Sequence, residues 1–448
     1  MKKTITVFAF IVAIIMIVCS CVTADNANIS RNSRYSSSPS LVVDPSGNPH
    51  IAWYDNKYGM LYTHWNCSDW VCADGTVYDP ASGNANVSIN SDSSSNPSLA
   101  LDSFGNPHIA CFDYSYGNPE ILYTRWNGND WVCADGSVYD PPMGNDANVS
   151  RNSGRSHHPS LALDSTGNPH IAWQDYSYGK SEILYTHWNG SDWLCADGTV
   201  YDPASGNANV STNSDSSSNP SIALDSSGNP HIVWQDYNYG NVEILYTHWD
   251  GSDWVCANRT VYDPARGNAN VSRNSSASIS PSFTLDSSGN PHIVWGDGNY
   301  IKREIFYTRW NGNDWVCADG TVFDPDLEPN PANISKNSGH SEYSSITLDS
   351  SDNLHIVWRC DYDSHRNSEM LYIRWDGTDW VCANGSVYDP DVETNPTIVS
   401  RNSGYSYQPS LALDSFGNPH IAWDKYDILY THWNSSDWVC ADGEVYDP

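Results

Sequence analysis

The sequence predicts an all-β protein, a seven-bladed β-propeller whose blades are four-stranded antiparallel sheets. One unit repeats seven times, and its histidine recurs at positions 50, 108, 170, 231, 292, 355 and 420. A repeat of this length, rich in turn residues, is typical of an array of identical sheet units. All 20 tryptophans fall in three slots of that unit. No helical period of apolar residues follows residue 24. A linear β-solenoid is the alternative, although its repeating units are usually shorter.

The first element is an apolar N-terminal segment, residues 1–24. Two lysines precede an uncharged apolar run, and small residues follow it up to Ala24. This order is typical of a secretory signal peptide and predicts a secreted or cell-surface protein. Two alternatives remain: lipidation of Cys21 in a lipobox-like context, and an uncleaved membrane anchor. Outside the cell, sequons such as those at Asn66 and Asn189 predict a glycoprotein.

The propeller is expected to occupy residues 25–448, and four strands are predicted in each unit. The blades are expected at about 27–85, 86–146, 147–207, 208–268, 269–331, 332–396 and 397–448. In the third unit, Gly167 marks the turn after strand one, and Asn189-Gly190 is a strong hairpin signal before strand four. The four strands of that unit are expected at 160–164, 170–174, 183–188 and 192–195, the last running on through 199–201.

Two residue types recur at fixed places in the unit. Seven of the 12 cysteines occupy the Trp-Val-Cys-Ala slot. Equivalent positions of successive blades are too far apart for a disulfide, so these cysteines are expected to be small buried hydrophobes. The repeated histidines begin strand two, away from the propeller axis, where seven equivalent side chains cannot converge on one metal. We therefore expect a structural role for them, such as a hydrogen bond to the blade turn.

The formal net charge of −32 excludes nucleic acid and anionic membrane surfaces as partners. No cofactor is expected. Calcium is a weaker alternative, because none of the acidic loops has the spacing of a recognised calcium motif. The acidic residues considered for it are Asp324, Asp326, Glu328, Asp389, Asp391 and Glu393.

The repeated phrase Pro-Ser-Leu-Ala-Leu-Asp-Ser-x-Gly-Asn-Pro-His-Ile-Ala-Trp, followed by Ile-Leu-Tyr-Thr-His-Trp-Asn-Gly, resembles the propeller repeats of secreted and cell-surface proteins of archaea and bacteria. These are grouped with sialidase-like repeats. The resemblance covers residues 27–448 and implies a propeller, but no particular activity. The Asp-box of true sialidase repeats is absent, because the spacing from Asp164 through Gly167 to Trp173 differs. No catalytic residue can be carried over.

Candidate ligand-binding residues lie in the loops between strands two and three. Tyrosine combines an apolar face with a hydroxyl group, and aspartate accepts hydrogen bonds, which together suit sugars. These loops are short in the first and last units, which are neighbours in the closed ring, so a notch is expected there, lined in part by Lys57. The candidates are Asp55, Tyr58, Asp113, Tyr114, Tyr116, Asp175, Tyr176, Tyr178, Asp236, Tyr237, Tyr239, Lys425 and Tyr426.

The sequence therefore predicts an extracellular binding or adhesion module that recognises carbohydrate at several equivalent sites. The near-identical units argue against a single asymmetric catalytic site, so the chain is not expected to be an enzyme. The partner is expected to be an extracellular glycan or a cell-surface protein, bound by a monomer. A sialidase-like glycoside hydrolase or polysaccharide lyase is one alternative, and a passive surface scaffold is another.

Overall fold

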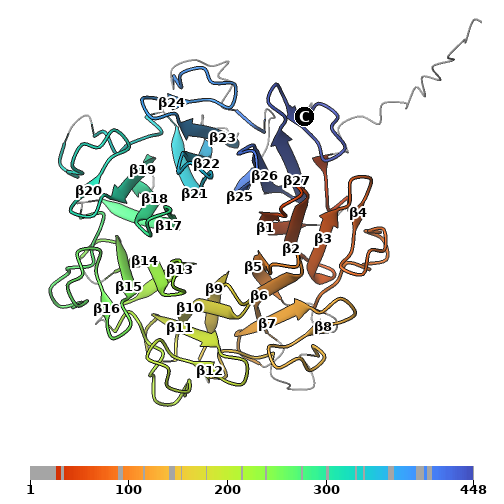
Figure 1. Ribbon diagram of the computed structural model, residues 1–448, viewed down its shortest axis with the longest axis horizontal. Helices are drawn as coiled ribbons and strands as arrows, with labels where there is room; N and C mark the ends of the chain where they lie inside the picture. The colour runs from red at the N-terminus through yellow and green to blue at the C-terminus, as the bar shows by residue number, and fades with distance from the viewer. Residues whose placement is uncertain are drawn as a thin grey trace, which may run out of the picture.

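The computed structural model describes residues 27–446, apart from 32–34, 89–93, 115–116, 141–146, 153, 178, 213–214, 238–239, 274–275, 299–301, 328–329, 337–338, 362–367, 390–397 and 401–405. Seven four-stranded antiparallel sheets stand in a ring, which confirms the predicted seven-bladed propeller (Figure 1). The predicted signal peptide with Cys21 lies outside the described residues. None of the described residues belongs to a helix long and apolar enough to cross a membrane.

The strands of each blade run outward from the axis in chain order. The innermost strands are β1 (Ser36–Val43), β5 (Ser95–Leu101), β9 (Ser156–Leu163), β13 (Ser217–Leu224), β17 (Ala277–Leu285), β21 (His340–Leu348) and β25 (Tyr407–Leu413). The second strands are β2 (Pro49–Asp55), β6 (Pro107–Asp113), β10 (Pro169–Asp175), β14 (Pro230–Asp236), β18 (Pro291–Gly298), β22 (Leu354–Asp361) and β26 (Pro419–Lys425).

The two outer strands of each blade differ in length. The third strands are β3 (Gly59–Trp65), β7 (Glu120–Trp126), β11 (Glu182–Trp188), β15 (Glu243–Trp249), β19 (Arg303–Trp310), β23 (Ser368–Trp375) and β27 (Asp427–Trp433). The fourth strands are β4 (Trp70–Val71), β8 (Trp131–Val132), β12 (Trp193–Leu194), β16 (Trp254–Val255), β20 (Trp315–Val316), β24 (Trp380–Val381) and β28 (Trp438–Val439).

The expectation that strand four runs on through 199–201 was wrong. The chain reverses after β12, where Cys195 N–H donates to the Thr199 carbonyl at 2.8 Å. Gly198 has a φ of +79° in this turn, a conformation that glycine adopts without steric cost. Val200 therefore forms a bridge back to Leu194 instead of extending the strand.

Aromatic side chains join each blade to the next. The tryptophans of the second strands, such as Trp173, are fully buried within the blades. The Tyr62 ring contacts Trp131 of the following blade edge to face, with ring centroids 5.7 Å apart. The same contact recurs around the ring and ends with Tyr430 against Trp70, also at 5.7 Å. The tryptophans that begin the fourth strands therefore pack between neighbouring blades.

The ring is closed by the segment that precedes β1. Ile29 N–H donates to the Ile428 carbonyl at 2.7 Å, and Asn28 forms a bridge with Leu429. In the first blade, Val87 N–H donates to the Met60 carbonyl in the same way. Residues 27–30 thus take the place on the last blade that residues 85–88 take on the first.

The cysteine prediction is also confirmed for the part of the chain that is described. Its ten cysteines are all free thiols, and all except Cys67 are buried. Those of the repeated slot lie among the apolar residues of the core, as Cys195 does beside Trp193.

Candidate functional site

Seven polar side chains, one from each blade, surround the axis of the ring. Each lies at a bulge that shifts the pairing of an innermost strand with its neighbour, and each has a φ between 44° and 56°. They and the residues that follow them line a cavity of about 340 Å³, a size typical of small-ligand sites. The seven, called here the axial ring, are Ser38, Asn96, His158, Asn219, Ser280, Tyr343 and Gln408.

Part of the axial ring is linked by hydrogen bonds. Ser38 Oγ lies 3.1 Å from Asn96 Oδ1 and 2.9 Å from Gln408 Oε1. Asn96 Nδ2 lies 3.2 Å from His158 Nδ1. Desolvation, followed by the charge of the neighbouring His157, lowers the pKa of His158. The imidazole is therefore neutral at pH 7, and this part of the ring carries no charge.

Around the axial ring, the seven blades differ at two further positions. The residue before each axial residue faces the residue after the second-strand tryptophan slot, and these pairs vary from blade to blade. They are Ser37 and Tyr54, Ser95 and Phe112, His157 and Gln174, Ser218 and Gln235, Ile279 and Gly296, Glu342 and Arg359, and Tyr407 and Asp424. We call the end of the ring at which these pairs lie the variable mouth.

Sequence reasoning missed the variable mouth, although a signal was present. In six of the seven units the axial residue precedes proline, in a phrase x-Pro-Ser whose first residue differs among otherwise similar units. The seven copies are therefore unlike one another at this end of the ring, while the expectation that repetition argues against a single asymmetric catalytic site stays a prediction.

The side of the variable mouth formed by blades two to four is aromatic. Phe112 contacts the His157 ring of the next blade at a centroid distance of 4.9 Å and Tyr114 at 5.9 Å. His157 also contacts Tyr176 at 6.1 Å. Tyr114 and Tyr176 are 48% and 45% exposed, so each presents much of its side chain to solvent.

The fourth blade continues this aromatic side with Tyr237, which is 42% exposed. The Gln174 amide donates to Tyr176 Oη at 2.8 Å, and the Gln235 amide approaches Tyr237 Oη at 3.5 Å. Exposed tyrosines thus occupy equivalent places on three successive blades, and in two of them an amide lies beside the hydroxyl group.

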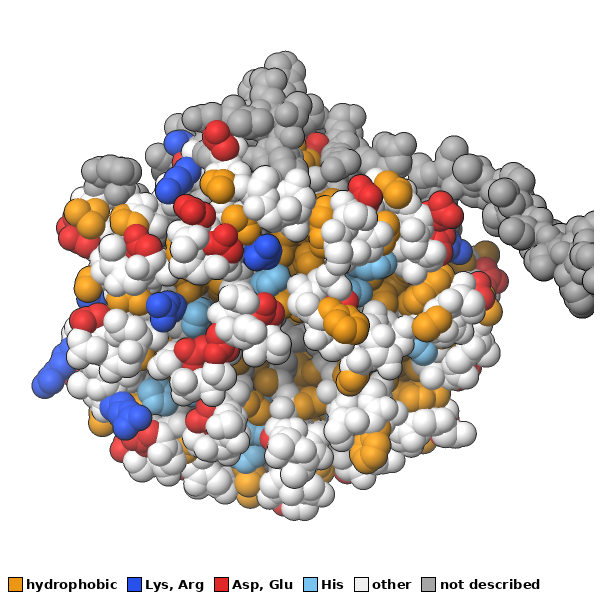
Figure 2. All heavy atoms as spheres, turned by 45° about the horizontal axis from the view of Figure 1, so that its top comes forward, with side chains coloured by type: hydrophobic (Ala, Val, Ile, Leu, Met, Phe, Trp, Pro, Cys, Tyr) orange, Lys and Arg blue, Asp and Glu red, His pale blue; other side chains and the backbone are white. Residues whose placement is uncertain are grey.

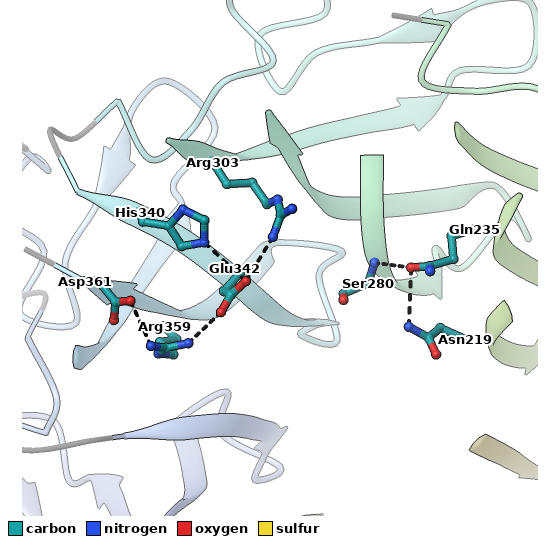
Figure 3. A network of polar contacts seen from close by, with 8 residues as sticks. All are labelled: Asn219, Gln235, Ser280, Arg303, His340, Glu342, Arg359 and Asp361. Atoms are coloured by element: carbon teal, nitrogen blue, oxygen red, sulfur yellow. Dashed lines mark hydrogen bonds and ion pairs between the residues drawn. The ribbon is translucent and has the colours of Figure 1, made fainter. Parts of the chain in front are cut away.

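The opposite side of the variable mouth, formed by blades five to seven, is charged (Figure 3). Glu342 Oε2 accepts from Arg303 Nη1 at 3.0 Å, and Glu342 Oε1 accepts from Arg359 Nη1 at 2.5 Å. Arg359 Nη2 also donates to Asp361 Oδ2 at 2.8 Å. His340 Nε2 lies 3.3 Å from Glu342 Oε2.

Two local features allow this charged cluster to form. A Cβ on Gly296 would lie 3.1 Å from Arg303 Cδ, so the glycine leaves room for the arginine to reach the next blade. The Arg359 guanidinium lies 4.1 Å above the Tyr407 ring of the last blade, a cation–π contact. The cluster therefore joins three blades.

The carboxyl groups of this cluster are in unlike environments. Burial by itself raises the pKa of Glu342, but the His340 hydrogen bond and the charges of Arg359 and Arg303 hold it below its usual value. Burial raises the pKa of Asp424 to about 7, against which the Asp424 backbone and the Arg359 charge act more weakly. Burial also raises the pKa of Asp361.

The four predicted aspartates do not reach the surface, and the expectation of exposed carboxylates is corrected. Asp55, Asp113, Asp175 and Asp236 are each 0% exposed. Asp175 Oδ2 accepts from Ser156 Oγ at 2.8 Å and from Trp173 Nε1 at 3.2 Å. These carboxylates lie at the end of the buried second strand of a blade. The serine at the start of the innermost strand lies beside each of them, so they accept hydrogen bonds from the chain itself.

The six predicted tyrosines of blades two to four divide into two groups. Tyr114, Tyr176 and Tyr237 are exposed at the variable mouth, while Tyr116, Tyr178 and Tyr239 lie outside the described residues.

The residues expected to line the notch between the first and last blades come together only in part. Tyr426 is 60% exposed, and its ring contacts Tyr35 at 6.4 Å. Tyr35 is in turn bonded through its carbonyl to the Asn56 N–H of the first blade. Tyr58, however, points to the return segment, where its hydroxyl donates to the Ala81 carbonyl at 2.7 Å. Lys57 lies over the Tyr58 ring at 4.1 Å, and burial lowers the pKa of Lys425.

The calcium candidates are described only in part. Asp324 Oδ1 accepts from the Asp326 N–H at 3.0 Å, as in an ordinary turn. Asp389 is described as well, whereas Glu328, Asp391 and Glu393 lie outside the described residues. Within the described ranges no cluster of metal-ligating side chains occurs.

The repeated histidines have a structural role, as expected. His50 Nδ1 lies 2.6 Å from Tyr62 Oη, and the equivalent pair in the third blade, His170 and Tyr185, lies at 2.7 Å. The turn carboxylate is farther away, with His50 Nε2 at 3.7 Å from Asp44 Oδ2. The short contact is therefore to strand three rather than to the blade turn.

Comparison with known proteins shows a likeness in fold. No family model and no curated protein sequence matches the chain. A solved polysaccharide lyase, an ulvan lyase, aligns with a TM-score of 0.52 and 11% identity over 90% of this chain and 95% of its own. The ulvan lyase bound to -[GlcA(1-4)Rha3S]- gives a TM-score of 0.51, with the same identity and coverage. A mutant of the Aleuria aurantia lectin in complex with Fucalpha1-6GlcNAc aligns with a TM-score of 0.42 and 11% identity, over 80% of this chain and 97% of its own.

Proposed function

We propose that the chain is an extracellular carbohydrate-binding propeller that holds glycans at the variable mouth. The observation that carries the proposal is the row of exposed tyrosines on blades two to four, beside amide and imidazole groups. A flat apolar ring stacks on the C–H face of a sugar, while hydroxyl and amide groups bind its hydroxyl groups.

Three further points support this proposal. Equivalent tyrosines on successive blades allow several weak contacts to act together through effective concentration. On the face shown in Figure 2, which is hollowed at the centre of the ring, acidic and basic side chains are scattered among other residues. Two solved structures that align with TM-scores above 0.5 are polysaccharide lyases. At 11% identity that is a likeness of fold, so the proposal depends on the residues of the mouth.

Secretion completes the proposal. The apolar segment at residues 1–24 would direct the chain out of the cell, either cleaved or retained through Cys21 or a membrane anchor. The partner would then be an extracellular glycan or a glycosylated surface protein. We propose that the propeller acts as a monomer, because one ring carries the whole mouth.

The test is binding of residues 25–448 to a broad glycan array, with and without calcium. We expect saturable binding that falls when Tyr114, Tyr176 and Tyr237 are changed together to alanine, by about 1 kcal/mol or more for each ring lost. Phe104→Ser, at an 89% exposed side chain at the opposite end of the strands, is the control that keeps binding. If the unchanged protein binds no glycan, either with or without calcium, carbohydrate recognition is refuted and a passive scaffold is favoured.

The charged cluster favours a second candidate, glycoside hydrolysis. Hydrolysis needs two carboxyl groups in unlike environments, and Asp424 and Glu342 meet that condition. The array glycans that bind would be incubated with the protein and analysed for new reducing ends. Release of reducing ends that Asp424→Asn abolishes would establish the enzyme, whereas intact glycans would leave the binding module.

A further inference from the structure

The charged cluster of blades five to seven has no free positive charge. Arg303 and Arg359 share Glu342, and Arg359 has Asp361 as a second carboxylate partner. Two guanidinium groups are thus balanced by two carboxylates. The side chains of Arg303 and Arg359 are only 6% and 10% exposed, so the pairs are screened little by solvent.

The geometry also fixes the guanidinium groups in place. Arg359 lies on the Tyr407 ring at 4.1 Å and spans two carboxylates, so it cannot turn outward without losing all three contacts. Arg303 passes over Gly296 to reach Glu342. Breaking a buried ion pair leaves an uncompensated charge, which is strongly unfavourable.

The cluster nevertheless has hydrogen-bonding capacity to spare. Arg359 Nε, Asp361 Oδ1, Asp424 Oδ1 and His340 Nδ1 are buried atoms without a hydrogen-bond partner. Asp424 itself is 3% exposed and adds a third carboxyl group to the same side of the mouth. Tyr343 of the axial ring, at 37% exposure, stands beside Glu342 at the edge of the cavity. Unpaired buried polar groups of this kind call for a ligand or water that can both donate and accept.

We propose that this side of the variable mouth binds a neutral sugar residue and discriminates against glycans that carry carboxylate or sulfate groups. Sugar hydroxyl groups donate to carboxylate oxygens and accept from a guanidinium N–H, so they match the unpaired set. An anionic group would find both arginines neutralised and a third carboxyl nearby. The net charge of −32 repels polyanions at longer range. This inference rests on the proposed carbohydrate recognition and specifies the class of glycan.

The test is an array on which neutral glycans are printed beside their uronate-containing, sialylated and sulfated counterparts. We expect binding to each recognised neutral glycan to exceed that to its acidic counterparts by about tenfold or more. Binding should also be unchanged from low to high salt, because no ion pair forms with the ligand. Preference for the acidic counterparts, weakened by salt, would overturn this inference and leave carbohydrate recognition intact. If the protein bound no glycan on the array, both this inference and the proposed carbohydrate recognition would be overturned.

Two substitutions test the residues named. Glu342→Gln removes one carboxylate from the two arginines, so we expect binding to acidic counterparts to rise by about tenfold relative to neutral glycans. Asp424→Asn should weaken binding to the neutral glycans. Phe104→Ser is the control and should change neither. If Glu342→Gln does not fold, Asp361→Asn removes a carboxylate from Arg359 alone and should shift the same ratio. An unchanged ratio in the folded variant would overturn the assignment.

Discussion

At the scale of single residues, burial decides what the repeated histidines do. His50 is 5% exposed and stacks on His64, with ring centroids 5.0 Å apart. Burial, followed by the charge that His64 would carry, lowers the pKa of His50 to about 4. Burial likewise lowers the pKa of His108 and His355 to about 4 and of His170 and His231 to about 3. These imidazoles are neutral parts of the core, which suits a hydrogen bond to tyrosine.

This burial predicts loss of stability in mild acid. The folded pKa of these histidines lies below the unfolded value of 6.5, so the unfolded chain takes up protons first as pH falls. Their contribution to the free energy of unfolding is complete above pH 6.5 and decreases as pH falls, down to about pH 4 for the first three histidines and about pH 3 for His170 and His231. Urea denaturation should show that the free energy of unfolding is lower at about pH 5 than at pH 7, by on the order of several kcal/mol for these histidines together. An equal midpoint at both pH values would contradict the prediction.

At the scale of strands and blades, the charged cluster depends on side chains from three strands that meet at Glu342. Glu342 of β21 receives Arg303 from β19 in the preceding blade and Arg359 from β22 in its own. Gly296 in β18 has no side chain, which leaves space for Arg303 to extend to the next blade. The four positions therefore depend on one another, although they are up to 63 residues apart in the chain.

This dependence predicts a coupling energy between Arg303 and Glu342. In a double-mutant cycle with Arg303→Met and Glu342→Gln, we expect the two losses of unfolding free energy to be non-additive by about 1–3 kcal/mol. The pair is buried, and removing one partner leaves the other charge unpaired. Lys302→Ala is the matched control in the same blade. That lysine is 57% exposed beside Glu304, and its loss should cost about 0.5 kcal/mol or less. Additive losses at Arg303 and Glu342 would show that the contact is not made.

At the scale of the whole molecule, the ring holds together through one seam between its two ends. Ile29 is fully buried and hydrogen-bonds to Ile428 of the last blade. Ile334 holds the same place on the fifth blade, where its N–H donates to the Ile305 carbonyl at 2.9 Å. The chain reaches Ile334 through the strands of the same blade that Ile334 contacts, whereas Ile29 and Ile428 come from opposite ends of the propeller.

The seam predicts different effects of the same substitution. Ile29→Ala and Ile334→Ala each remove a buried side chain and should each cost about 2–4 kcal/mol. Only Ile29→Ala should also speed hydrogen exchange in β27 and β1, because no chain connection holds these strands together when the contact weakens. Equal exchange in the two variants would argue that the remaining contacts between the first and last blades are sufficient.

Much of the whole-molecule architecture was determined by the sequence itself. Repetition, turn glycines and the tryptophan slots fixed the seven blades, because each unit repeats the same local patterns of turn and apolar residues. The buried cysteines and the structural histidines followed from their place in the unit. The reversal after β12 was missed, since a glycine turn inside an apolar stretch resembles a continuing strand.

The site was decided by the tertiary structure. Asp175 and Tyr176 are adjacent in sequence, yet one is buried and the other 45% exposed. Periodicity could not separate them, because burial at the end of a strand depends on the serine that the innermost strand places opposite. The axial ring and the charged cluster join residues from different blades, and only closure of the ring brings them together. The sequence by itself therefore determined the repeating unit, whose contacts are local, whereas the variable mouth exists only where seven units meet.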